Sequence, residues 1–168
     1  INANLYDMLL VQDVAQPDRL LPALAERWQV SDDRKTLTFN LRPDVKFQSG
    51  NPLSSEDVVW SLQRVLKLNL ALASTWKAYG FSADNVDRLI RATDPNTVVI
   101  ELARPTDPML VLNTLATSPS AFILDRKKVL EHENNNDLGA AWQVTHAAGS
   151  GAFVLNDWRA NAVLLMTR

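Results

Sequence analysis

The sequence predicts an α+β fold, with an antiparallel or mixed sheet built from hairpins and with helices packed against it. Pairs of strand-like segments are each joined by a short polar turn, and single amphipathic helices lie between them. No regular strand–helix–strand repeat accompanies them, which argues against a parallel α/β sheet. The composition is that of an ordinary globular protein, because 46% of the residues are apolar and 21% are charged. A chain of 168 residues is long enough for one core that buries roughly 70% of the unfolded chain's surface.

The first elements predicted are a short helix and a β-hairpin. Asn4 is placed to cap the helix, whose apolar face consists of Leu5, Met8 and Leu9. Residues 28–30 read as a strand and residues 31–35 as a polar turn. After the turn, apolar and polar residues alternate, which indicates a half-buried strand with the inward set Leu37, Phe39 and Leu41. The alternation runs on to residue 47, so we expect an edge position or a bulge at Pro43.

One helix is predicted strongly. Ser54 followed by Asp57 resembles a capping box, and residues 55–67 place apolar side chains at helical spacing. Residues 68–83 leave two interpretations open, more helix or a loop, and they carry the aromatic residues Trp76, Tyr79 and Phe81.

The residue pattern in the second half of the chain predicts two further hairpins and two helices. The second hairpin has arms at 85–93 and 97–103, joined by a turn that contains Pro95. Asp107 caps the next helix, whose buried side we expect to include Met109, Leu112 and Leu115 or Ala116.

Residues 118–124 read as a short extended piece. Asp125 then caps a helix that runs to about residue 133. The third hairpin has arms at 153–158 and 163–167 around a turn at 159–162.

Several classes of protein are excluded by composition. The net charge is −2 and no basic stripe is present, so nothing resembles the electrostatic footprint of a nucleic-acid-binding protein. No cysteine is present, which removes disulfides, thiolate nucleophiles and cysteine-type zinc sites. No apolar run approaches the roughly 20 residues that a membrane span requires. The chain starts at Ile1 without a signal segment, so we expect that both of its ends were cut from a longer protein.

Motif chemistry predicts neither a catalytic residue nor a cofactor. Gly149, Ser150 and Gly151 do not form the five-residue nucleophile elbow, and we interpret them as a flexible turn. His132 lies between two glutamates, where a metal site and a solvated helix end are both conceivable. Neighbouring residues on a helix face different directions, so we expect the solvated end and no metal site.

The tryptophans divide into two groups. Four of them lie in or beside patterned apolar segments and are predicted to be core residues: Trp28, Trp60, Trp142 and Trp158. Trp76 and Tyr79 lie in the unpatterned region, where they could form the wall of a binding site or pack inside, since aromatic side chains serve both roles.

A set of short sequence motifs is more specific than these periodic patterns. Residues 21–28 read LPALAERW, residues 35–39 read KTLTF, and residues 41–47 read LRPDVKF. In the same order follow GNPLSSEDV at 50–58, DPNTVVIEL at 94–102 and GSGAF at 149–153, with LYDML near the start. The set resembles the family-5 solute-binding proteins, the dipeptide, oligopeptide and nickel receptors of ABC importers. Ser55 and Ala152 depart from the pattern, which more often has alanine and proline at these places.

The resemblance implies part of a two-lobed periplasmic-binding-protein-like fold that closes around a ligand. Residues 1–148 would form part of the N-terminal lobe with its small accessory subdomain. Residues 149–168 would return the chain to the base of that lobe, through a hinge-like turn at Gly149 and Gly151. The C-terminal lobe would be absent from this chain.

The function implied is capture of a peptide or a related small solute outside the cytoplasm and delivery to an ABC permease in the cytoplasmic membrane. The protein would be a monomer, periplasmic or otherwise extracytoplasmic, with a membrane anchor as one alternative, and not an enzyme. Ligand contacts would come from Trp76, Tyr79, Ser118 and Ser120. The alternative is a stand-alone α+β module that binds peptides or proteins and has no transport role.

Overall fold

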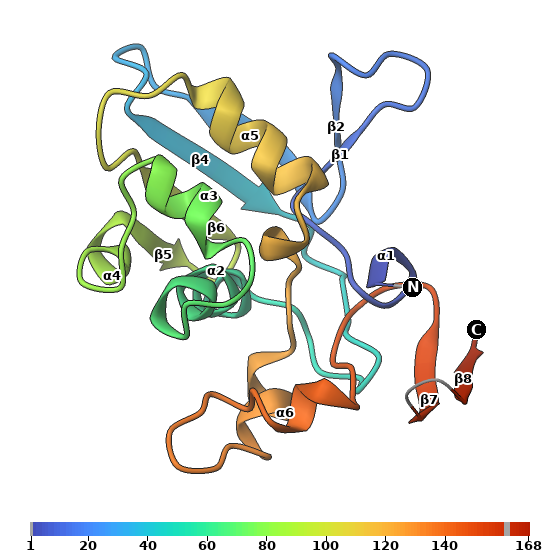
Figure 1. Cartoon of the computed structure of the whole chain (residues 1–168). Helices are drawn as coiled ribbons and strands as arrows, with labels where there is room; N and C mark the ends of the chain where they lie inside the picture. Colours follow the sequence, from blue (N-terminus) through green and yellow to red (C-terminus); the bar gives the residue numbers. More distant parts are fainter. Residues whose placement is uncertain (1, 160–161) are drawn as a thin grey trace.

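A four-stranded antiparallel sheet forms the centre of the computed structural model, which describes residues 2–159 and 162–168 (Figure 1). Its strands stand in the order β3-β4-β6-β5, with bounds β3 Ala25–Val30, β4 Thr36–Leu41, β5 Ile90–Asp94 and β6 Thr97–Glu101. Hairpins join β3 to β4 and β5 to β6. The prediction of an α+β fold with an antiparallel sheet is therefore confirmed.

Strand β4 lies inside the sheet and follows the predicted alternation. Its inward side chains Leu37, Phe39 and Leu41 are buried, while the residues between them are half-buried. The strand ends at Leu41, before Pro43, so the expected edge position or bulge at Pro43 was wrong. The N–H of Arg42 bonds the carbonyl of Leu24 at 3.0 Å, and proline then offers no N–H to continue the ladder.

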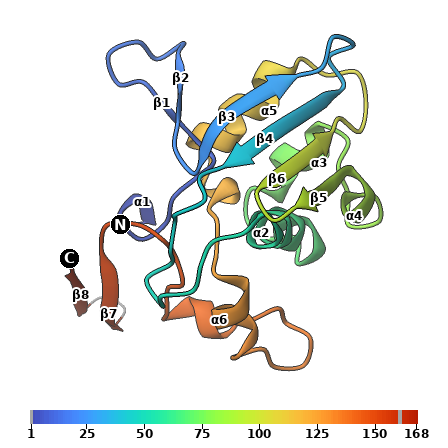
Figure 2. The same cartoon turned by 180° about the vertical axis from the view of Figure 1, so that it is seen from behind.

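Helices cover one face of the sheet and leave the other open, as Figures 1 and 2 show from opposite sides. The covering helices are α2 (Ser55–Lys67), α3 (Ala73–Ala78) and α5 (Pro108–Thr117). Helix α2 has the predicted bounds, and the Asp57 carboxylate accepts hydrogen bonds from the N–H and the hydroxyl of Ser54. The main core lies between these helices and the inner face of the sheet.

Two details of this layer differ from the sequence prediction. The first arm of the second hairpin begins with a helical turn, α4 (Val86–Leu89), because the N–H of Val86 bonds back to the carbonyl of Ser82. Asp107 caps α5 as predicted, but Met109 is 40% exposed and does not belong to the buried side.

The remaining elements surround this body. They are α1 (Asn2–Leu5), β1 (Leu10–Gln12), β2 (Leu20–Pro22), the 3-10 helix η1 (Pro119–Ala121), α6 (Arg126–Leu130), the 3-10 helix η2 (Trp142–Val144), β7 (Val154–Arg159) and β8 (Val163–Thr167). Strands β1 and β2 pair in a projecting hairpin, and β7 and β8 form another (Figure 1).

These elements confirm part of the prediction and correct the rest. The hairpin β7–β8 is confirmed, although two residues of its turn, 160 and 161, lie outside the described part, as does Ile1. Asn4 lies inside α1 instead of capping it. The extended piece at 118–124 contains η1, because Ser118 caps a turn there, and α6 ends at Leu130, earlier than expected.

Buried polar groups tie α6 to the body. The Asp125 carboxylate accepts hydrogen bonds from the Ser49 hydroxyl and the Asn51 amide, and it caps α6 through the N–H of Lys128. The second oxygen of Asp57 accepts the N–H of Arg126 at 3.1 Å. The Asp57 carboxylate therefore joins the start of α2 to the start of α6, and Asp125 joins α6 to the segment that carries Ser49 and Asn51.

The tryptophans follow the prediction only in part. Trp28 is half-buried against the main core, and Trp60 and Trp142 pack against a second, smaller cluster. Trp158 is 45% exposed on β7, so its assignment to the core was wrong. Its strand belongs to a two-stranded hairpin, which offers no second layer to cover the ring.

Within residues 2–159 and 162–168, no helix combines the length and the apolar character needed to cross a membrane.

Candidate functional site

Three of the predicted ligand residues form one internal cluster. The indole Nε1 of Trp76 donates a hydrogen bond to Oγ of Ser120 at 3.0 Å, and the hydroxyls of Ser118 and Ser120 lie 2.8 Å apart. The Trp76 ring has no exposed surface and meets Phe81 edge to face at 5.6 Å. Trp76 and Ser120 are therefore packing residues in this structure, which is the second of the two interpretations that the sequence left open for Trp76. Ser118 remains half-buried at the surface.

Tyr79 lies apart from that cluster. Its hydroxyl is 3.0 Å from the hydroxyl of Thr114 and 3.3 Å from the carbonyl of Leu110, both on α5. The ring is half-buried and packs against the main core. These contacts fix the end of α3 to α5 and leave part of the ring accessible.

Gly149 and Gly151 lie against the first helix. A Cβ on Gly149 would be 2.0 Å from the carbonyl oxygen of Leu5, and one on Gly151 would be 2.5 Å from that of Asn4. Neither glycine has a positive φ, so their conformational freedom is not what the turn needs. The turn requires glycine because two backbones meet there, and the N–H of Gly151 bonds Leu5 O at 3.1 Å.

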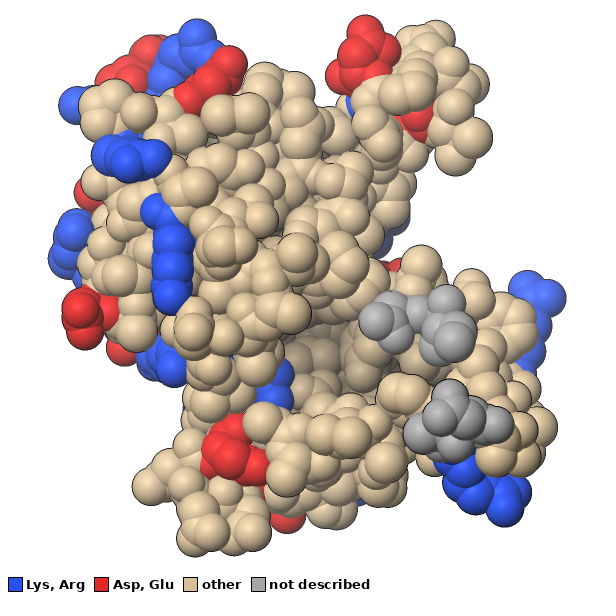
Figure 3. All heavy atoms as spheres, viewed as in Figure 1, with Lys and Arg blue, Asp and Glu red and all other residues tan. Residues whose placement is uncertain are grey.

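Next to η1 the surface is hollowed. The hollow has a volume of about 470 Å³, within the range typical of small-molecule sites. Figure 3 shows this face recessed between the body with the sheet and the part with α6, β7 and β8. We call it the η1 hollow; its lining residues include Tyr6, Arg64, Pro119, Phe122, Gln143 and Trp158.

The walls of the η1 hollow are aromatic. The rings of Tyr6 and Phe122 stack with centroids 5.4 Å apart. Burial raises the pKa of the Tyr6 hydroxyl, which keeps it protonated and able to donate a hydrogen bond at neutral pH. The charged group is Arg64 of α2, a residue that the sequence analysis did not single out because it reads as one polar position on an amphipathic helix.

A stacked trio of rings lies beside this hollow and was also not foreseen. Trp142 lies between His132 and His146, with centroid distances of 4.5 and 4.8 Å and nearly parallel planes. Nδ1 of His146 is 3.0 Å from the carbonyl of Trp142. His132, just after the end of α6, therefore stacks against an indole ring. In the part of the chain that the structure describes, no group of three or more metal-ligating side chains gathers.

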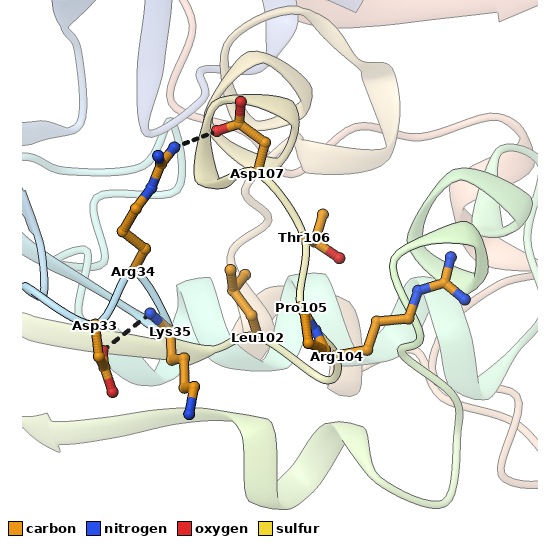
Figure 4. A pocket seen from close by; sticks show the side chains of 8 residues that line it. All are labelled: Asp33, Arg34, Lys35, Leu102, Arg104, Pro105, Thr106 and Asp107. Atoms are coloured by element: carbon orange, nitrogen blue, oxygen red, sulfur yellow. Dashed lines mark hydrogen bonds and ion pairs between the residues drawn. The ribbon is translucent and has the colours of Figure 1, made fainter.

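A second hollow lies at the opposite end of the sheet, beside the turn between β3 and β4 (Figure 4). Part of its polar lining is already satisfied, since Arg34 forms an ion pair with Asp107 at 2.8 Å and the Asp33 carboxylate accepts the backbone N–H of Lys35. Exposed pairs of this kind contribute little energy and are screened by salt. The η1 hollow is therefore the better candidate for a binding site.

Comparison with known families decides the class of protein. Residues 19–168 match the family described as bacterial extracellular solute-binding proteins, family 5, middle region. The chain belongs to this family. Membership confirms the resemblance stated from the sequence, and the family consists of binding proteins and not of enzymes.

Similar proteins include several that are named for peptides. The chain is 34% identical over 143 residues to the probable D,D-dipeptide-binding periplasmic protein DdpA of Escherichia coli, covering 85% of this chain and 25% of the relative. It is 28% identical over 181 residues to the periplasmic oligopeptide-binding protein OppA of the same species, covering 100% of this chain and 31% of OppA. The chain thus spans about a quarter to a third of the length of these relatives.

Solved structures agree with this assignment. The chain aligns with DppA from Helicobacter pylori, solved in complex with the peptide STSA, at a TM-score of 0.75 and 26% identity over 97% of this chain and 33% of DppA. It aligns with MoaA from Agrobacterium tumefaciens R10, solved with mannopinic acid, at a TM-score of 0.76 and 26% identity over 99% and 31% of the two chains. The fold is therefore part of a periplasmic-binding-protein structure.

Proposed function

We propose that the protein containing this chain is the substrate-binding component of an ABC-type importer, which captures peptides outside the cytoplasmic membrane. The observation that carries the proposal is the family match over residues 19–168, together with relatives named for dipeptides and oligopeptides. Its partners would be the solute and an ABC permease in the cytoplasmic membrane. The relatives DdpA and OppA are named as periplasmic, which supports an extracytoplasmic location.

We further propose a division of the chain. Residues 1–148 form part of the N-terminal lobe with its accessory subdomain, and residues 149–168 return the chain to the base of the lobe. The tight contact of Gly149 and Gly151 with α1 supports this return, because it joins the two ends of the lobe segment. A second lobe elsewhere in the full-length protein would complete the ligand cleft.

The ligand-facing side of this lobe would be the surface around η1. Ser118 lies at the start of η1, and Pro119 of η1 lines the η1 hollow. Ser118 and the accessible part of Tyr79 remain the proposed contacts among those predicted from sequence. Trp76 and Ser120 would act by holding η1 in place from inside.

Thermal unfolding of the full-length protein tests the proposal. A ligand at 100 times its Kd stabilises the native state by about 2.7 kcal/mol, which raises the melting temperature measurably. We expect di-, tri- and longer peptides to raise it, with Ni(L-His) and mannopinic acid as non-peptide comparators. If only a non-peptide solute raises the melting temperature, the solute class is wrong; if no solute does, the binding function itself is contradicted.

A further inference from the structure

Arg64 is a buried cation in the last turn of α2. The residue is only 4% exposed. Its Nε donates a hydrogen bond to the carbonyl of Leu138 at 2.8 Å, and its Cζ lies 5.6 Å from the centre of the Trp60 ring. Burial lowers the pKa of the guanidinium, but arginine stays charged in proteins. A full positive charge is therefore held inside the protein.

No carboxylate contacts this charge within the described ranges 2–159 and 162–168. Arg64 forms no ion pair there, and the only hydrogen bond from its side chain is the one from Nε. Asp137 is near enough to influence the pKa of Arg64. Its oxygens, however, accept the N–H groups of Asn134, Gly139 and Ala141. A buried charge without a direct partner is costly, so such a group points to function.

The Nη groups of Arg64 have no hydrogen-bond partner among the described residues. Among the described residues, no fully buried side-chain nitrogen or oxygen lacks a hydrogen-bond partner. The unbonded Nη atoms of Arg64 therefore keep some contact with solvent, although the residue as a whole is 96% enclosed. Arg64 lines the η1 hollow, which supplies that contact.

The rest of the hollow suits an apolar body. Tyr6, Phe122 and Trp158 line it, and a smaller neighbouring hollow of about 120 Å³ shares Tyr6, Gln143 and Trp158 with it. The smaller hollow adds apolar walls from Leu5, Leu155 and Leu164. Aromatic and aliphatic surface thus surrounds a single guanidinium, with a phenol and an amide beside it as further hydrogen-bonding groups.

We propose that Arg64 binds a carboxylate group of the solute, whose apolar part lies against Tyr6, Phe122 and Trp158. A planar guanidinium matches a carboxylate through two parallel hydrogen bonds. A single cation balances one negative charge, and the nearby Asp137 disfavours a doubly charged group such as phosphate. The inference rests on the proposed solute-binding function and adds to it the chemistry of one contact.

A carboxylate could also come from another part of the full-length protein. In that case Arg64 would be neutralised before any solute arrives and would not distinguish an acidic solute from a neutral one. The experiment must therefore compare two solutes that differ only in this charge.

Titration calorimetry on the full-length protein supplies the comparison, with the tripeptide Ala-Ala-Phe and its C-terminal amide as probes. Truncating one partner of a buried, hydrogen-bonded charge pair costs 2–5 kcal/mol, so we expect the acid to bind at least about 30-fold more tightly than the amide. In Arg64→Gln this ratio should fall below about 3-fold.

Arg126→Gln is the matched control, because Arg126 is an exposed arginine at the start of α6 and lies outside the η1 hollow. It should keep the wild-type ratio. Circular dichroism melting shows whether Arg64→Gln is folded. If it is not, Arg64→Lys replaces it, because lysine keeps the charge without the planar fork. The acid-to-amide affinity ratio of Arg64→Lys should lie between the wild-type ratio and 1.

Two results overturn the inference and leave the proposed function intact: equal affinity of wild type for acid and amide, or an unchanged ratio in Arg64→Gln. If neither peptide binds the wild type, the peptide-binding function fails instead. The pair 3-phenylpropionate and 3-phenylpropanamide then repeats the comparison, and absence of any preference for the acid overturns the inference as well.

Discussion

Nε1 of Trp76 donates a hydrogen bond to Oγ of Ser120, 3.0 Å away, and both side chains are buried. The bond joins α3 to η1, two segments separated by 44 positions in the chain. It explains how a short 3-10 turn is held at the edge of the η1 hollow. An indole N–H at this depth needs an acceptor, and the serine hydroxyl is the one that the fold provides.

Removal of that acceptor should destabilise the protein. Ser120→Ala leaves the indole N–H buried without a partner, so we expect a loss of about 1–3 kcal/mol in the free energy of unfolding. Urea denaturation measures it. Ser74→Ala on the exposed side of α3 is the control and should change the free energy by less than about 0.5 kcal/mol. Equal effects of the two substitutions would contradict the role of Ser120.

The close contact of Gly149 and Gly151 with α1 makes a separate prediction. Gly149→Ala places a Cβ 2.0 Å from the carbonyl oxygen of Leu5, which the backbone cannot accommodate without moving. We expect a loss of more than about 3 kcal/mol and increased hydrogen exchange at Gly151, whose N–H bonds Leu5. Ser150→Ala, which removes only a hydroxyl contact with Asp7, should cost about 1 kcal/mol. A Gly149→Ala protein as stable as wild type would show that the close approach is absent.

Asp57 should give the protein a pH-dependent stability in the acid range. Burial raises the pKa of its carboxyl above the ordinary value of 3.8. The folded state therefore binds the proton more tightly than the unfolded state, and this group's contribution to stability falls as pH rises from 3.8 through the raised pKa. In Asp57→Asn that fall should vanish, so the mutant gains stability relative to wild type across this window. Urea melts at several pH values measure the difference.

Asp137 should give a pH dependence of stability opposite to that of Asp57. Hydrogen bonds from backbone N–H groups, that of Asn134 first, lower the pKa of its carboxyl. The contribution of Asp137 to stability is present above pH 3.8, the ordinary pKa of the group, and is lost as pH falls through the lowered pKa. Asp137→Asn should therefore lose stability relative to wild type as pH rises through that window. The same direction of change in Asp57→Asn and Asp137→Asn would contradict the assigned environments.

Trp158 should affect binding more than stability. Its ring is 45% exposed on β7 and lines the η1 hollow. In the full-length protein, Trp158→Ala should weaken binding of Ala-Ala-Phe by about 5-fold or more, since aromatic side chains dominate contact energy. Trp28→Ala, at a half-buried site that does not line the hollow, should lower the melting temperature and leave the Kd nearly unchanged. An unchanged Kd in Trp158→Ala would remove this ring from the site.

Sequence patterns predicted those helices and strands that are determined by residues close together in the chain. Helix α2 and strand β4 were found because their apolar residues follow strict periods of 3.6 and 2, and Asp107 and Asp125 mark helix starts by a contact within three residues. Strands β1 and β2 were missed, because only three residues pair in each of them.

Burial of single side chains depended on contacts between distant segments. Trp158 lies in a patterned apolar segment and Trp76 in an unpatterned one, yet Trp76 is fully buried against Phe81 and η1 while Trp158 projects from a lone hairpin. Arg64 reads as a solvated helix position, but it is buried and bonds the carbonyl of Leu138, which is distant in the chain. The glycines at 149 and 151 were identified as important for the wrong reason, because no local signal reveals the carbonyls of Asn4 and Leu5 beside them.

The most direct measurement is a calorimetric titration of Ala-Ala-Phe into this 168-residue chain and, in parallel, into the full-length protein. If the chain is one wall of a cleft that a second lobe completes, the full-length protein binds with a micromolar or smaller Kd, and the chain alone binds at least about 100-fold more weakly, a difference of about 2.7 kcal/mol. Micromolar binding by the chain alone, or no binding of any peptide by the full-length protein, would contradict that role.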